Sequence, residues 1–154
     1  MTPKDQNHAR NHSGSSAANK ATIARLAEPR LIQSTNPIAG RFIYSLRLIA
    51  IHQKARRDPV PELATRLNSM HIAAKALALS QAVSALWPEN IRVSRFCCCQ
   101  LTHDEVTIAA MIEGAHDRDR AAFDRATEGF IRPDRAERLW HGVLELVEAE
   151  LTSC

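Results

Sequence analysis

Apolar residues recur at helical spacing in five separate segments of this sequence, and this pattern limits the chain to helical folds. Within each segment the apolar side chains follow one another at steps of three and four residues, which places them on one face of an α-helix. The predicted helices cover residues 37–57, 58–86, 102–114, 117–129 and 134–151. Only 5 glycines occur in 154 residues, which disfavours a turn-rich β fold. The sequence therefore predicts an all-α protein, a compact bundle of about five helices with short connections.

Local start and stop signals support these boundaries. Asn36-Pro37 combines a favoured N-cap residue with proline in the first turn of the first helix. Thr102 and Glu105 match a capping box at the start of the third helix. Gly129 has the position of a left-handed terminator after the fourth. We predict residues 58–86 as one continuous central helix.

The first 34 residues differ from the rest of the chain. Residues 11–16 are small and polar, so ordering them would cost conformational entropy without burying apolar surface. We expect a disordered tail at residues 1–34 and a single all-α domain at residues 35–152. No apolar run approaches the about 20 residues that cross a bilayer, and the N-terminus lacks the apolar core of a signal peptide. The expected location is the cytoplasm, with no membrane partner.

The positive charge is concentrated in the first part of the sequence. The formal net charge of +3 divides into +7 for residues 1–60 and −4 for residues 61–154. A basic region can contact an anionic partner, and the candidate contacts to nucleic-acid phosphates are Arg41, Arg47, Arg56 and Arg57. These basic residues lack interleaved aromatic side chains that would stack on bases. Nucleic acid is therefore a disfavoured partner.

Three consecutive cysteines, Cys97, Cys98 and Cys99, are the most unusual chemical feature of the chain. They lie shortly before the third predicted helix, and cysteines near a helix N-terminus have lowered thiol pKa values. In an extended chain alternate side chains share a side, so Cys97 and Cys99 are expected to point together with Cys98 opposed. Reactive or redox-active thiols are one interpretation of this cluster.

A zinc site is a second interpretation of the cluster. His103 follows closely and would bring the donor set to three sulfur or nitrogen ligands. A fourth ligand would have to come from Cys154 or His116. The spacing departs from the Cys-x2–4-Cys pattern of structural zinc sites, and no second pair exists. The third interpretation is that the cysteines pack as small apolar residues beneath the bundle, which is the ordinary fate of a free cysteine.

Residues 97–105 resemble a motif found in one protein family. Their sequence, CCCQLTHDE, is similar to the Cys-Cys-x-x-Met/Leu-Thr-x-x-Glu junction of a family of small proteobacterial helical proteins of unknown function. The resemblance extends over about residues 38–151, with two apolar helices before the cysteines. The family has proline at the position of Cys99, so any shared role falls on Cys97 and Cys98. The resemblance implies a shared helical fold and brings no known activity, substrate or cofactor.

The sequence contains no recognisable catalytic motif. Gly-x-Ser-x-Gly, a phosphate-binding glycine loop, His-Glu-x-x-His and the dinucleotide fingerprint are all missing, so an enzyme is disfavoured. With 45% hydrophobic residues, the chain is expected to be a small cytosolic protein that acts by protein–protein interaction or self-association. Apolar surface on the first two helices that the shorter helices leave uncovered would form the interface. The alternative is a metal- or thiol-redox-sensing protein centred on Cys97, Cys98 and Cys99.

Overall fold

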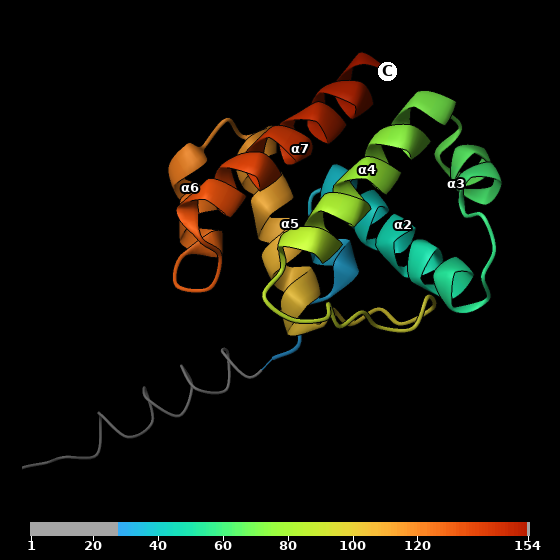
Figure 1. The fold of residues 1–154 in the computed structure, drawn as a ribbon, viewed down its shortest axis with the longest axis horizontal. Helices are drawn as coiled ribbons and strands as arrows, with labels where there is room; N and C mark the ends of the chain where they lie inside the picture. Colours follow the sequence, from blue (N-terminus) through green and yellow to red (C-terminus); the bar gives the residue numbers. More distant parts are fainter. Residues whose placement is uncertain (1–27, 154) are drawn as a thin grey trace, which may run out of the picture.

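The computed structural model describes residues 28–153, which form helices joined by loops (Figure 1). The elements are η1 (Ile32–Ser34), α2 (Pro37–Lys54), α3 (Val60–Leu67), α4 (Met70–Leu86), α5 (His103–His116), α6 (Arg120–Thr127) and α7 (Pro133–Thr152). Within this range there is no β-strand, and the only β-type pairing is an isolated bridge between Leu31 and Gln100. The all-α prediction is confirmed, with six α-helices in the described range in place of about five.

Four long helices enclose the main hydrophobic core. Helices α4 and α7 lie side by side, and α2 and α5 lie behind them (Figure 1). The short α3 packs on α4 at one edge, and α6 packs on α5 at the other. The core contains fully buried side chains from all four long helices, among them Phe42, Leu79, Ile112 and Leu139. The amphipathic faces read from the sequence therefore meet in one core.

The predicted helix at residues 58–86 is wrong, because the chain breaks it into α3 and α4. Asn68 follows α3 with a φ of 51°, in the left-handed region that asparagine tolerates better than most residues. Ser69 then serves as the N-cap of α4, and its hydroxyl accepts a hydrogen bond from the backbone N–H of Ile72 at 3.1 Å. Both are good cap residues, and together they favour a corner over a continuous helix.

Other local signals act as predicted. Thr102 and Glu105 form a complete capping box at the start of α5. Gly129 has a φ of 85°, so it occupies the left-handed conformation expected of a terminator. The start of α6 lies later than predicted, because Asp119 provides the cap by accepting from the backbone N–H of Ala122 at 3.0 Å.

Part of the segment predicted as a tail contacts the body of the domain. Residues 1–27 lie outside the described residues. Ile32 is 5% exposed and belongs to the core, and its backbone N–H donates to the Cys99 carbonyl at 2.9 Å. The Leu101 N–H donates in turn to the Arg30 carbonyl at 2.9 Å. Ordered contacts therefore begin before residue 35. Over residues 28–153 no helix has the length and apolar character required to cross a membrane.

Candidate functional site

The cysteines lie in the loop between α4 and α5, and the backbone of this loop covers a buried arginine. Arg47 projects from α2 and is 1% exposed. Its Nε lies 2.7 Å from Oε1 of Glu105, and its Nη2 lies 2.9 Å from Oε2, so the pair is bidentate. Both side chains are completely buried. The hydrogen bonds to Glu105 outweigh the effect of burial and raise the pKa of Arg47 above its ordinary value.

The guanidinium of Arg47 also holds the backbone of the loop. Nη1 donates to the carbonyl oxygens of Cys98 at 2.6 Å and of Arg95 at 3.3 Å. Nη2 donates to the carbonyl of Gln100 at 3.1 Å. Three loop carbonyls therefore point inward at one fork of donors, and this geometry is available to arginine and not to lysine.

Glu105 holds the two ends of the same loop. Its carboxylate accepts from the backbone N–H of Ser94 at 3.1 Å and of Thr102 at 2.9 Å. The capping-box glutamate predicted from the sequence thus has a second role, as the partner of Arg47. A buried ion pair is stable only when its remaining donors and acceptors are satisfied, and here the loop backbone satisfies them.

The loop displays two of the three thiols to solvent. Cys97 and Cys99 are exposed and Cys98 is half-buried. The chain makes a turn at Phe96 and Cys97, so it is not extended there as the predicted alternation of side chains assumed. The expectation that the cysteines pack beneath the bundle is wrong for Cys97 and Cys99, because the loop covers Arg47 with its backbone and leaves these side chains outside. The reason is tertiary, since the inward-facing carbonyls determine which way the side chains point.

The zinc ligands proposed from the sequence are not assembled in the described part of the chain. Among residues 28–153 no group of three His, Cys, Asp or Glu side chains lies close enough to hold a metal ion. His103 is the first residue of α5 and His116 is its last, about 20 Å along the helix at 1.5 Å per residue. Cys154 lies outside the described residues.

Of the four arginines proposed as nucleic-acid contacts, Arg47 lies away from the surface. Arg47 is buried and bound to Glu105, so it offers no donor to a phosphate at the surface. Arg41 forms an ion pair with Glu150 of α7. Arg56 and Arg57 are exposed in the loop after α2. The sequence did hold a signal for Arg47: an arginine within the apolar run 42–51 requires a buried acidic partner.

An apolar groove lies beside this loop, on the outer face of α2. We call it the α2 groove; it has a volume of about 340 Å³ and is lined by Arg41, Tyr44, Ser45, Leu48, Leu63, Arg66, Leu67 and Phe96. It continues into a hollow of about 260 Å³ lined by Leu48, Ile51, His52, Ala55, Arg57, Glu62, Arg66 and Phe96. Phe96, the neighbour of Cys97, packs on Tyr44 with a centroid distance of 5.8 Å. The cysteine loop therefore forms one wall of the groove.

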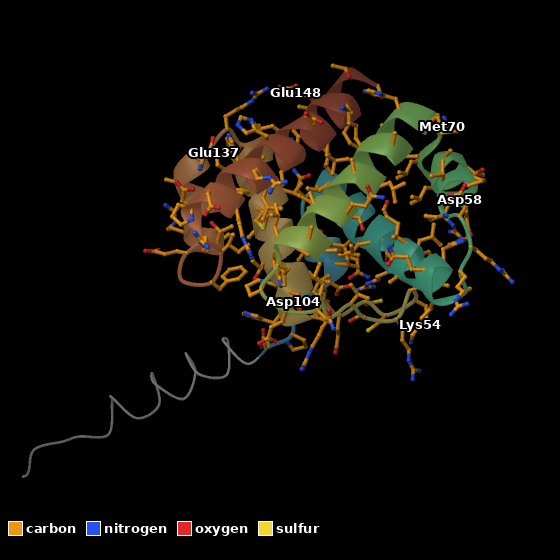
Figure 2. The ribbon with its side chains drawn as sticks, viewed as in Figure 1. Lys54, Asp58, Met70, Asp104, Glu137 and Glu148 are labelled. Carbon is orange, nitrogen blue, oxygen red and sulfur yellow. The ribbon has the colours of Figure 1, made fainter. Side chains whose placement is uncertain are left out.

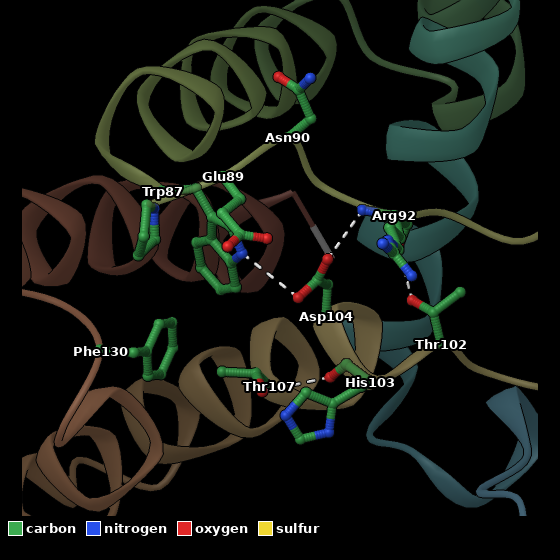
Figure 3. Close-up of a pocket in the computed structure, with 10 residues that line it drawn as sticks. Trp87, Glu89, Asn90, Arg92, Thr102, His103, Asp104, Thr107 and Phe130 are labelled. Atoms are coloured by element: carbon green, nitrogen blue, oxygen red, sulfur yellow. Dashed lines mark hydrogen bonds between the residues drawn. The ribbon is translucent and has the colours of Figure 1, made fainter.

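A larger pocket of about 640 Å³ opens beside the N-terminus of α5 (Figure 3). Asp104 lies within it and accepts from Trp87 Nε1 at 3.3 Å and from the backbone N–H of Arg92 at 2.8 Å. Phe130, from the loop before α7, packs edge-on against Trp87 with a centroid distance of 5.2 Å. No local pattern in the sequence indicates this pocket, because its walls come from three separate segments.

Comparison with known proteins identifies no relative of this chain. No protein-family model, curated protein or solved structure matches it significantly. The resemblance at residues 97–105 therefore remains a prediction, and function has to be argued from the geometry.

Proposed function

We propose that this protein acts by protein–protein association through the α2 groove, and that a second copy of the chain occupies the groove. The observation that carries the proposal is a stripe of apolar side chains on the outer face of α2. Tyr44 and Ile51 are 40% and 49% exposed, and they stand seven residues apart on either side of Leu48 in the groove. Apolar side chains grouped in a groove are typical of a binding surface.

The charge around the groove indicates what would bind there. The Arg66 guanidinium lies 5.0 Å from the ring centroid of Phe96, and Arg57 lines the adjoining hollow. Lys54 is exposed at the same end of α2, whereas Glu62 supplies one negative charge (Figure 2). Glu62 pairs with Arg66 and Glu150 pairs with Arg41, so the remaining positive charge beside the apolar floor comes from Arg57 and Lys54. An occupant with apolar anchors and flanking carboxylates is complementary to it.

The last turns of α7 have this chemistry. Leu151 is 49% exposed, and Glu145 and Glu148 are exposed on the same helix. Glu150 forms its ion pair with Arg41, which lines the groove, so the acidic end of α7 adjoins the groove on the same molecule. Two complementary patches side by side allow a two-fold dimer in which each α7 end occupies the groove of the other copy.

Sedimentation velocity across about 1–200 µM protein tests the proposal, because one groove of this size supports a dissociation constant in the micromolar range. The wild-type chain is expected to dimerise reversibly. Ile51→Glu and Leu151→Glu should each weaken dimerisation by at least about tenfold, since each places a charge in a desolvated contact. Ala121→Glu, at an exposed position of α6, introduces the same charge elsewhere and should leave dimerisation unchanged.

Mixing the two variants distinguishes the proposed exchange from other dimers. A heterodimer of Ile51→Glu with Leu151→Glu keeps one intact groove facing one intact α7 end. It should therefore form more tightly than either variant alone. A strictly monomeric wild-type protein overturns the proposal, and a mixture that dimerises no better than its components overturns α7 as the occupant.

A thiol-redox function is a second candidate, favoured by the exposure of both Cys97 and Cys99 on a backbone held by Arg47. We propose that hydrogen peroxide oxidises these two thiols to one disulfide: the two S–H bonds are lost, one S–S bond forms, and the peroxide is reduced to two waters. In a Cys154→Ser background, peroxide should remove two titratable thiols and two hydrogen atoms of mass. Cys97→Ser should abolish this loss and Cys98→Ser should not. The zinc content of the same sample, measured before oxidation, tests the alternative that the cysteine cluster senses a metal ion.

A further inference from the structure

We propose that the pocket beside the N-terminus of α5 binds a small organic ammonium ion. This inference does not depend on the function proposed above, because the pocket shares no lining residue with the α2 groove. At about 640 Å³ it falls within the size range of small-molecule sites. Its two aromatic rings and two carboxylates determine the kind of ligand that it fits.

Trp87 and Phe130 form the aromatic wall of the pocket (Figure 3). Their rings meet at 69°, and the Trp87 indole is held by its N–H donated to Asp104. Phe130 is 39% exposed although it is a large apolar residue, so part of its ring surface is open to a ligand. An aromatic ring attracts a cation placed over its face, and most strongly where water is excluded.

Two carboxylates stand next to this wall. Asp104 uses one lone pair on each oxygen, for Trp87 Nε1 and the Arg92 N–H, and so retains acceptor capacity on both. Glu89 is exposed and no hydrogen bond or ion pair of its carboxylate is found within residues 28–153. Glu89, Asp104 and Trp87 all line the same pocket, and the Glu89 carboxylate overlaps the Trp87 indole in the view of Figure 3. The pocket lining is therefore rich in hydrogen-bond acceptors, and it carries two carboxylates.

In the lining of this pocket, two carboxylates stand against one guanidinium. Arg92 and His103 also line it. An anionic ligand would meet Glu89 and Asp104, and a neutral apolar ligand would desolvate them without replacing their water. An ammonium ion with apolar substituents satisfies the carboxylates and the rings together.

Calorimetric titration with choline and with its neutral isostere 3,3-dimethylbutan-1-ol tests this proposal. The two molecules have nearly the same shape and differ in the charge of the quaternary centre. Choline is expected to bind at one site per chain, at least about tenfold more tightly than the neutral alcohol, because cation–π and carboxylate contacts require the charge. Equal affinities, or no saturable choline binding below about 10 mM, overturn the proposal.

Variants locate the site. Glu89→Gln, at an exposed position, and Phe130→Leu should each weaken choline binding by about fivefold to tenfold. Glu148→Gln removes an exposed carboxylate from α7, far from Asp104 in Figure 2, and should leave the affinity unchanged. Phe96→Leu alters the α2 groove and should also have no effect, so failure of the dimer model and failure of this proposal are distinguishable. Choline binding that survives Glu89→Gln and Phe130→Leu unchanged overturns the assignment to this pocket.

Discussion

Replacing Arg47 with methionine tests whether the buried guanidinium organises the cysteine loop. The substitution leaves the carboxylate of Glu105 completely buried without a compensating charge, and breaking a buried pair in this way costs about 3–5 kcal/mol. It also removes the donors to three loop carbonyls. Two of these carbonyls keep another donor, Arg95 from the Cys98 N–H and Gln100 from the Ser94 hydroxyl, so we assign the three about 1 kcal/mol together. The expected loss is about 4–6 kcal/mol, a large share of the about 5–15 kcal/mol that stabilises a typical domain.

Urea unfolding at pH 7 with linear extrapolation measures this loss. Amide hydrogen exchange adds a local readout, because the N–H groups of Ser94 and Thr102 should exchange faster when Glu105 loses its partner. Arg132→Met is the matched control: Arg132 is 75% exposed and lies 3.5 Å from Asp134, and such surface pairs contribute about 0–1 kcal/mol. A loss below about 1 kcal/mol in Arg47→Met would refute the reasoning.

The double variant Arg47→Met, Glu105→Met separates the ion pair from its backbone contacts. It removes the stranded charge, but the Cys98 carbonyl and the amide groups of Ser94 and Thr102 still lack their partners. We therefore expect the double variant to remain at least about 2 kcal/mol less stable than the wild type. A double variant as stable as the wild type would show that Arg47 and Glu105 only neutralise each other's charge and that their backbone contacts add no stability.

Substitutions at three further positions test local features of the fold. Asn68→Val should lower stability by about 1–2 kcal/mol in thermal unfolding, because a β-branched residue resists the φ of 51°, whereas Asn68→Gly should change little. Gly114→Ala should cost about 1–3 kcal/mol by urea unfolding, since its Cβ would lie 3.0 Å from the backbone nitrogen of Phe123; unchanged stability would contradict this packing. The hydrogen bond with His52 lowers the pKa of Glu62 below its ordinary 4.5, and the hydrogen bond with Arg66 adds to the effect. The ionised Glu62 therefore stabilises the fold above pH 4.5, and this contribution is lost as the pH falls through the lower pKa of the folded state. Glu62→Gln should therefore flatten the decline of Tm in acid, and an identical pH profile in the variant would count against this contact.

The helical class and most helix ends could be predicted from the sequence because they depend on neighbouring residues. The capping box of Thr102 and Glu105 and the left-handed Gly129 each involve a few consecutive positions, so the residues that specify them are visible together. The corner at Asn68 was missed although it is local, because the apolar periodicity continues across it and left no gap between α3 and α4.

The tertiary structure decided the sites. Arg47 and Glu105 are 58 positions apart, and only packing of α2 against α5 brings them together. That contact turns the loop carbonyls inward and leaves Cys97 and Cys99 outside. The sequence determined which segments become helices, because hydrogen bonds and side-chain spacing within a helix are short-range. Which faces meet, which charges are buried and which apolar residues remain uncovered depend on long-range packing, where one helix excludes water from another.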